Sequence, residues 1–233
     1  MSEECSREEY TRAYAITRII VRLAVPLLGG ITVIGAENIP KTGPIILAPN
    51  HRSYMDPPYL SLVTKRQLHL MAKDSLFRVP VFGPYIKAMG AFPVKRGAAD
   101  RGALKQAMAE LKAGRVLGIF PEGTRAEPGT LLPGEKGFAL VAKQTGVPIV
   151  PIALERTDRV LPKKGGLHRA HVRAIIGKPM TAAEMLALYP DPSKDALTII
   201  SEATMRAIAD LMTGPVVILE ATEKEEKERR ARK

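Results

Sequence analysis

The sequence predicts an α/β domain in which a mostly parallel sheet is wrapped by helices, with an amphipathic helical element ahead of it. Two observations support this fold class. From residue 31 onward, short apolar runs alternate with segments of helical periodicity. The apolar share of 45% and the charged share of 25% are those of an ordinary globular protein. We therefore expect a helical element over residues 1–30, a single domain over 31–215 and a charged tail over 216–233.

Strands are predicted at seven places, each a short run rich in apolar residues. The runs are 31–35, 45–50, 68–73, 91–95, 115–120, 147–154 and 171–177. Helical patterns lie between them, and the clearest covers 99–114, which ends on a glycine. Residues 192–212 predict a final amphipathic helix. Strands that alternate with helices at this spacing favour a largely parallel sheet.

The segment 11–35 contains no acidic residue. It is too interrupted for the roughly 20-residue apolar stretch that spans a bilayer, because arginines, a proline and a glycine pair break it. On a helix, its apolar face is separate from the face that carries Arg18 and Arg22. Two interpretations stay open: the helix lies on an anionic membrane, or it packs on the domain with its arginines in water. The apolar face holds Ile16, Ile19, Ile20 and Leu23.

The net charge of +11 indicates an anionic partner. Nucleic acid ranks behind a membrane surface and a phosphorylated substrate, because aromatic residues make up only 5%, Trp is absent and no nucleic-acid-binding signature is present. The single cysteine, Cys5, allows no disulfide within one chain and suits a reducing compartment. No secretory signal is evident, because the first ten residues are acidic.

Two His–Asp pairs share one spacing: His51 with Asp56, and His69 with Asp74. Residues five apart on a helix lie about 140° around its axis, so the chain must turn for the side chains to meet. His51 follows the predicted strand 45–50, at the carboxyl end where open α/β sheets place ligands. Asp56 is the expected N-cap of the next helix, ahead of a proline. A loop of this length can fold Asp56 back onto the imidazole.

The second pair lies in a different setting. His69 falls inside the alternating run 68–73, and an extended strand would hold it far from Asp74. We therefore expect His69 to be structural, and the pair in the loop to be functional. A carboxylate bonded to one imidazole nitrogen leaves the other as a base, which can deprotonate a hydroxyl as it attacks an acyl group. No GxSxG nucleophile elbow is present, so direct transfer to a substrate hydroxyl is favoured.

Two further motifs lie at predicted strand ends. "FPEGTRA" places Glu122 and Arg125 around Gly123, and "GAFPVKRG" supplies Arg96. Glycine lets the backbone pass close to a ligand, and the arginine fork suits a phosphate. The plainer interpretation of "EGTR" is a turn closed by a surface ion pair. The "HRAH" stretch lacks nearby cysteines and has few acids, so no metal site is expected.

Together these motifs resemble a known family. "NHRSYMD", "GAFPVKR", "FPEGTRA" and "VPIVPIAL" occur in the order and approximate spacing of the four blocks of the glycerolipid acyltransferases. The chain most resembles the bacterial 1-acyl-glycerol-3-phosphate acyltransferases, from about residue 33 to residue 152. The first and third blocks are close matches. The second departs from the pattern at Pro93 and Lys95 but keeps its arginine, Arg96.

The resemblance implies a role for each matching residue. His51 would be the general base and Asp56 its orienting partner. The fourth block would help form the acyl-donor site, and the fold would be a mostly parallel sheet wrapped by helices, seated on the membrane by an N-terminal helical element. The residues implied in binding the acceptor phosphate are Arg96, Glu122, Gly123, Thr124, Arg125 and, as a lesser candidate, Lys136.

The reaction that the resemblance implies moves a fatty acyl group from acyl-CoA or acyl-carrier-protein to 1-acyl-glycerol 3-phosphate, giving phosphatidic acid. No cofactor, metal or covalent acyl-enzyme is expected. The expected location is peripheral, on the cytoplasmic face of the cell membrane, with an anionic membrane surface and no nucleic acid as partner. Two alternatives remain: the same chemistry on another lysophospholipid or glycolipid, or a catalytically silent membrane-binding protein.

Overall fold

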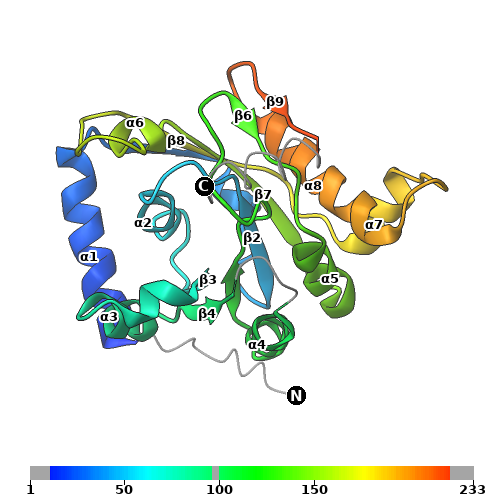
Figure 1. Cartoon of the computed structure of the whole chain (residues 1–233), viewed down its shortest axis with the longest axis horizontal. Helices are drawn as coiled ribbons and strands as arrows, with labels where there is room; N and C mark the ends of the chain where they lie inside the picture. The colour runs from blue at the N-terminus through cyan, green and yellow to red at the C-terminus, as the bar shows by residue number, and fades with distance from the viewer. Residues whose placement is uncertain (1–10, 96–99, 221–233) are drawn as a thin grey trace.

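A computed structural model describes residues 11–95 and 100–220 (Figure 1). The predicted tail beyond residue 220 lies outside the described residues, as do Cys5 and Arg96. The division into a helical element, one domain and a tail therefore stays a prediction at both ends of the chain.

The centre of the molecule is a seven-stranded sheet with the order β1-β8-β7-β2-β5-β3-β4. All seven predicted strands are present. A two-stranded sheet of β6 (Thr130–Leu131) and β9 (Val217–Ile218) lies apart from it and was not predicted. The seven strands are β1 (Ile31–Ile34), β2 (Ile45–Pro49), β3 (Leu68–Lys73), β4 (Phe92–Val94), β5 (Val116–Gly118), β7 (Ile149–Glu155) and β8 (Val172–Ile176).

The large sheet is mostly parallel, as the alternating pattern predicts. Its neighbouring strands pair in parallel, except that β7 and β8 are antiparallel. Because β1 pairs with β8 in parallel, these two strands run against the other five. The carboxyl ends of β2, β5 and β7 consequently meet at one edge of the sheet, where the predicted motifs begin.

Helices cover both faces of the sheet (Figure 1). One face is covered by α1 (Arg12–Leu27), α2 (Asp56–Leu60) and α3 (Phe82–Ala88). The other is covered by four helices, and short helical turns join several elements. The four are α4 (Arg101–Lys112), α5 (Lys136–Thr145), α7 (Ala182–Leu188) and α8 (Ala196–Leu211); the turns are α6 (Thr157–Val160), η1 (Ala36–Asn38) and η2 (Asp74–Arg78).

The core is accordingly divided into two layers by the sheet. Successive residues of β2 point to opposite faces: Ile45 and Leu47 pack with Tyr14 of α1, whereas Ile46 packs with Phe138 of α5. All five residues of β2 are buried. A strand buried on both faces is expected at the centre of a parallel sheet, and its rigidity gives the loop that follows it a fixed origin.

Helix α1 confirms the predicted N-terminal helix but corrects the predicted place of one arginine. The Arg18 guanidinium points inward and donates to the backbone carbonyls of Ser61 and Thr64, at 3.2 and 3.0 Å, just beyond α2. The last carbonyls of a helix lack internal partners, which is why a cation is favoured there. The interpretation that places both arginines in water is therefore wrong for Arg18, while Arg22 is exposed.

The apolar face of α1 points away from the domain. Its side chains are 58–74% exposed, although amphipathic helices normally bury this face. Within residues 11–95 and 100–220, no helix is long and apolar enough to cross a bilayer. The exposed side chains are Ile16, Ile19, Ile20, Leu23 and Leu27.

Candidate active site

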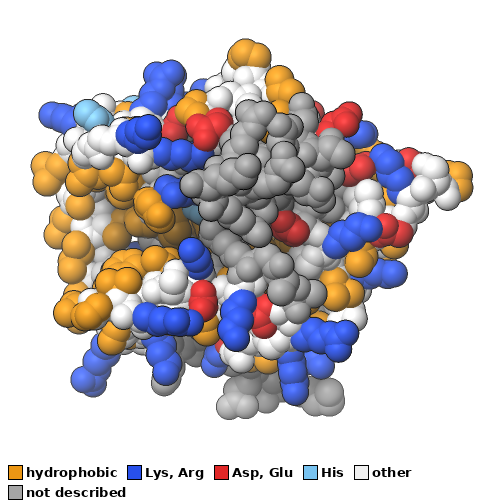
Figure 2. Space-filling model, in the orientation of Figure 1, with side chains coloured by type: hydrophobic (Ala, Val, Ile, Leu, Met, Phe, Trp, Pro, Cys, Tyr) orange, Lys and Arg blue, Asp and Glu red, His pale blue; other side chains and the backbone are white. Residues whose placement is uncertain are grey.

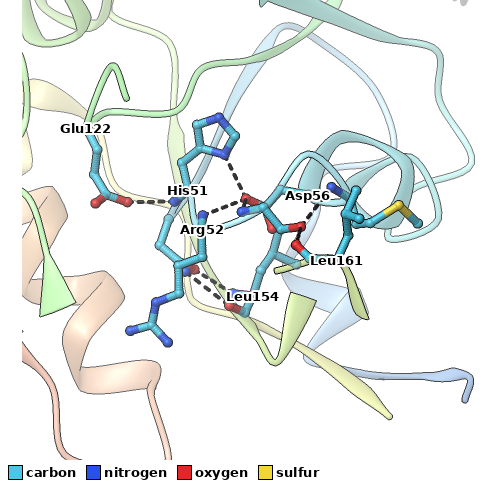
Figure 3. Close-up of polar contacts among 9 residues, drawn as sticks. His51, Arg52, Asp56, Glu122, Leu154 and Leu161 are labelled. Carbon is cyan, nitrogen blue, oxygen red and sulfur yellow. Dashed lines mark hydrogen bonds and ion pairs between the residues drawn. The ribbon is translucent and has the colours of Figure 1, made fainter. Parts of the chain in front are cut away.

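The loop after β2 is fastened to the neighbouring strand before it reaches His51. The buried Asn50 side chain accepts from the Leu154 N–H at 2.6 Å and donates to the Leu154 carbonyl at 3.1 Å. Ser53, two residues beyond His51, donates its hydroxyl to the Leu161 carbonyl at 2.9 Å. Both anchors are shown in Figure 3. A loop held by buried hydrogen bonds on both sides of a histidine keeps that histidine in one place.

His51 and Asp56 meet, as the sequence predicts. Asp56 Oδ2 lies 2.7 Å from His51 Nδ1, and the carboxylate is fully buried while the imidazole is 10% exposed (Figure 3). An acceptor at Nδ1 stabilises the tautomer that carries its proton there, which leaves Nε2 as the basic nitrogen. The pair can therefore accept a proton at Nε2 and stabilise the imidazolium that results.

Asp56 is not the N-cap of α2, which corrects the sequence prediction. Met55 occupies the cap position without a side-chain bond, and Asp56 is the first residue of the helix. Asp56 Oδ2 accepts instead from the backbone N–H groups of Arg52 and Ser53, at 2.7 and 2.8 Å. The carboxylate thus closes the loop on itself, and the same oxygen that holds the imidazole also holds the turn.

The third motif forms hydrogen bonds with the backbone N–H and the backbone carbonyl of His51. The His51 N–H donates to Glu122 Oε1 at 2.6 Å, and the His51 carbonyl accepts from the Ala126 N–H at 2.8 Å. The Phe120 ring stacks on the imidazole with centroids 4.2 Å apart. Residues 120–126 follow β5, the neighbour of β2 in the sheet, so two strand ends build one rigid site.

Glu122 is placed as a support for this loop. Its side chain is 0% exposed, and its second oxygen accepts from the Leu132 N–H at 2.8 Å. Burial raises the pKa of Glu122 to about 7, against the two backbone N–H donors and Arg52, which lower it. Both carboxylate oxygens are bonded inside the protein, and the substrate contact that the resemblance implies for Glu122 stays a prediction.

Arg125 stacks on the ring of Tyr54, and its implied role in binding the phosphate stays a prediction. Its guanidinium carbon lies 3.7 Å from the centroid of the Tyr54 ring, which is 61% exposed. Tyr54 belongs to the loop between His51 and Asp56, so the stack places Arg125 beside the first motif. Gly123 has a φ of +69°, and a Cβ there would come within 3.0 Å of the Glu135 side chain, so the turn requires glycine. The adjacent Thr124 is partly exposed.

Lys136 has another partner in this structure. It begins α5, and its ammonium lies 2.7 Å from Asp195 Oδ2, which also caps α8. The Lys136 hydrogen bond and the helix N–H groups hold the pKa of Asp195 well below its usual range. Lys136 is thus engaged in joining two helices. Arg96 lies outside the described residues, so its predicted role stays a prediction.

His69 is separate from Asp74, as predicted for a strand residue. It lies in β3, and its Nδ1 is 3.4 Å from Glu110 of α4, whereas Asp74 pairs with Arg78 at 2.9 Å. Among the described residues, no group of three or more His, Cys, Asp and Glu side chains could hold a metal ion. The buried His51–Asp56 pair at the carboxyl edge of the sheet is the candidate acid–base pair of an enzyme, and the sequence contains no GxSxG nucleophile elbow.

Comparisons with known proteins identify the class. The sequence profile described as Acyltransferase matches residues 30–155. The 1-acyl-sn-glycerol-3-phosphate acyltransferase of Bacillus subtilis is 31% identical over 82% of this chain and 92% of its own length. A chloroplastic enzyme of the same description from Brassica napus is 37% identical over 63% of this chain, which spans 44% of that longer protein.

A solved structure agrees with these relatives. The 1-acyl-sn-glycerophosphate (LPA) acyltransferase PlsC of Thermotoga maritima is similar with a TM-score of 0.69 and 27% identity, over 86% of this chain and 80% of that one. The chain belongs to the acyltransferase family.

Proposed function

We propose that the protein transfers a fatty acyl group to the free hydroxyl of 1-acyl-glycerol 3-phosphate, giving phosphatidic acid. The observation that carries the proposal is the 2.7 Å contact between His51 Nδ1 and the buried Asp56 carboxylate, at the place where the family's first block lies. The names of the relatives from Bacillus subtilis and Thermotoga maritima give the acceptor. Acyl-CoA and acyl-carrier-protein are the two proposed donors.

The chemistry follows from the tautomer that Asp56 holds. His51 Nε2 takes the proton of the acceptor hydroxyl as the oxygen attacks the carbonyl carbon of the donor thioester. The new C–O bond forms, the C–S bond breaks, and the departing thiolate takes the proton from the imidazolium. The acyl group passes directly from the thioester sulfur to the acceptor oxygen, so the proposed mechanism needs no acyl-enzyme, and His51 is regenerated in each turnover. General-base catalysis of this kind contributes roughly 10²–10⁴ to a rate.

Arg125 supplies the proposed contact to the acceptor's phosphate. A guanidinium presents two parallel N–H donors that match a phosphate, and a stacked ring restricts its motion before the ligand arrives. Arg96 remains the proposed second cation, from the block after β4. Recognition would then rest on two strand ends of the parallel sheet, with the base at a third.

The exposed apolar face of α1 is the proposed membrane contact. It is joined by side chains at the start of α3, and Figure 2 shows hydrophobic side chains gathered over both helices, at the left of the molecule. An apolar helical face flanked by basic residues suits the surface of an anionic bilayer, here the cytoplasmic face of the cell membrane. The contributing side chains are those of Val81, which precedes α3, and of Phe82 and Tyr85 within it; they are 85%, 43% and 41% exposed.

A transfer assay tests the proposed activity. The purified protein is incubated with labelled acyl-CoA or acyl-carrier-protein and with 1-acyl-glycerol 3-phosphate, another lysophospholipid or a glycolipid. The expected product is labelled phosphatidic acid, with His51→Ala as the inactive control. Preferential labelling of another acceptor would move the protein to a different substrate of the same family. A folded protein that labels no acceptor would support the silent membrane-binding alternative.

Vesicle sedimentation tests the proposed membrane contact. Because Tyr14 and Val25 of α1 are buried, deleting the helix would open the core, and point substitutions are the sharper test. Ile19→Asp with Leu23→Asp should abolish binding to anionic vesicles, whereas Arg22→Glu should weaken it by about 1 kcal/mol. Binding that is indifferent to the double substitution would contradict the proposal. Arg18 is left unchanged because it anchors α1 to the end of α2.

A further inference from the structure

One carboxylate joins the two loops that build the site. Glu122 follows β5, and its two oxygens accept hydrogen bonds from different segments: the His51 N–H at 2.6 Å and the Leu132 N–H at 2.8 Å. Leu132 comes directly after β6, so the carboxylate spans the loop after β2 and the segment after β6. Figure 3 shows its bond to the backbone of His51, on the opposite side of the loop from Asp56.

These contacts do not fit a residue that binds the acceptor. Glu122 is 0% exposed, and each of its carboxylate oxygens already accepts a hydrogen bond from the protein backbone. Arg125, three residues later in the same turn, is partly exposed and carries the opposite charge. Of the two charged residues of the motif, Glu122 therefore contacts the protein interior and Arg125 is accessible to a ligand.

We propose that Glu122 is a positioning residue, which fixes the imidazole of His51 by holding that residue's backbone N–H. This inference rests on the proposed function, since it gives Glu122 a part in the same transfer. His51 is held by three contacts. The Ala126 N–H donates to its carbonyl, the Phe120 ring stacks on its imidazole, and Glu122 accepts from its N–H. A base displaced by 1 Å from the attacking hydroxyl costs about 10²-fold in rate.

Steady-state kinetics of Glu122→Gln separate positioning from binding. The amide keeps one acceptor oxygen but turns an NH₂ group toward a backbone N–H, so one of the two hydrogen bonds is lost. The kcat should fall at least about tenfold, because the imidazole is no longer held in place. The KM of the acceptor should stay within about twofold. Glu202→Gln, on the exposed side of α8, is the matched control and should leave both constants unchanged.

The outcomes distinguish this inference from the proposed function. A wild-type protein that acylates 1-acyl-glycerol 3-phosphate sustains the function, whatever Glu122 does. A Glu122→Gln enzyme with a raised acceptor KM and an unchanged kcat would overturn the positioning role and make Glu122 a ligand. Unchanged values of both constants would overturn it as well.

Amide exchange in the wild-type protein gives a second test that does not depend on a variant folding. The N–H groups of His51 and Leu132 should be protected from exchange with deuterated solvent, because both donate to a buried carboxylate. Saturating 1-acyl-glycerol 3-phosphate should leave their protection unchanged or stronger. A loss of protection at either N–H on adding the acceptor would mean that Glu122 releases it to bind the ligand, and would overturn the inference.

Discussion

His51 and His69 stand at the same distance before an aspartate and each has a carboxylate near Nδ1, but the two carboxylates serve different partners. Asp56 lies 2.7 Å from His51, and its other donors are backbone N–H groups of the same loop. Glu110 lies 3.4 Å from His69 and only 2.6 Å from Arg115. The only side chain bonded to the Asp56 carboxylate among these contacts is therefore the His51 imidazole, whereas the Glu110 carboxylate is shared between His69 and the Arg115 guanidinium.

The backbone explains the difference between these two regions. The chain leaves β2 before His51 and turns through a closed loop, so a residue five positions later returns to the imidazole. His69 is the second residue of β3, whose neighbours are β5 and β4, and the extended chain carries Asp74 away to pair with Arg78. The same spacing thus gives a dyad only where a strand ends at the carboxyl edge of the sheet.

The largest difference between the regions should come from removing one charge in each. Asp56→Asn should lower kcat by roughly 10²–10⁴, because the neutral amide no longer stabilises the imidazolium formed in the transfer. The amide oxygen can still accept from the N–H groups of Arg52 and Ser53, so the loop keeps its shape. The measurement is kcat in the labelled-acyl assay, with circular dichroism to check the fold.

Asp74→Asn is the matched control. It has the same spacing from a histidine and should keep kcat within about threefold of wild type. A folded Asp74→Asn enzyme without activity, or an Asp56→Asn enzyme with full activity, would contradict the assignment of Asp56 as the partner of the base.

A second effect concerns the pH dependence of stability that the buried Glu122 causes beside His51. Burial raises the pKa of Glu122 to about 7 from an ordinary value of 4.5, so the folded protein binds more protons than the unfolded chain between those pH values. Glu122 therefore contributes stability that is fully present below pH 4.5. It is lost as the pH rises to about 7, on the order of 3 kcal/mol in total.

Glu122→Gln should remove this slope. Urea unfolding at pH 5 and pH 7.5 measures the free energy of unfolding of both proteins, and other groups that titrate contribute equally to each. The advantage of wild type over the variant should be larger at pH 5. An advantage that is equal at the two pH values would show that Glu122 does not gain a proton on folding.

A third effect separates binding from catalysis beside the dyad. Arg125→Ala should raise the acceptor's KM about tenfold or more while the donor's KM stays near its wild-type value, since a hydrogen bond to a charged group is worth roughly 1.5–3 kcal/mol. Arg125→Lys should restore only part of the loss, because a point charge lacks the planar fork. Tyr54→Ala should have a smaller effect of the same kind, about 0.5–1 kcal/mol for an exposed stack.

The control for this series is Arg78→Ala, which removes an exposed arginine near the His69 region. Its kinetic constants should match wild type. Equal increases in the KM of both substrates for Arg125→Ala would indicate a structural role for Arg125.

The smallest expected effect on activity is at the His69 site. Glu110→Gln should lower the free energy of unfolding by about 1–3 kcal/mol, because it weakens the bond between a buried carboxylate and the partly exposed Arg115. The kcat should remain within a few-fold of wild type. A stable Glu110→Gln protein with greatly reduced kcat would mean that this bond affects the active site.

The strands and the dyad were predictable, because both depend on local pattern. A continuous apolar run is expected for a strand buried on both faces, as in β2, and the glycine after α4 marks its end. The strands β6 and β9 were missed, because two residues are too few to show an alternation of apolar and polar side chains. The reversal of β8 and β1 was not predictable, because hydropathy carries no information on strand direction.

The orientations and hydrogen-bond partners of individual side chains were less predictable. The letters "EGTR" do not say that Glu122 points inward and Arg125 outward, because that depends on the neighbouring loop and the positive φ of Gly123. Arg18 was placed on a polar face of α1, but the carbonyls that receive it lie beyond α2. Asp56 was predicted to cap the N-terminus of α2, but its carboxylate accepts hydrogen bonds from the N–H groups of Arg52 and Ser53, which precede the helix. The differences at Glu122 and Arg18 arise from tertiary contacts, whereas the difference at Asp56 arises from the local turn of its own loop.

The role of His51 as the base is tested by comparing His51→Ala with His69→Ala in one assay. Both substitutions remove an imidazole whose Nδ1 lies near a buried carboxylate, and only their place in the fold differs. We expect His51→Ala to lower kcat by at least roughly 10²–10⁴ in a folded protein, while His69→Ala stays within a few-fold of wild type. Comparable activity in the two variants, or a greater loss in His69→Ala, would contradict the assignment of His51 as the base.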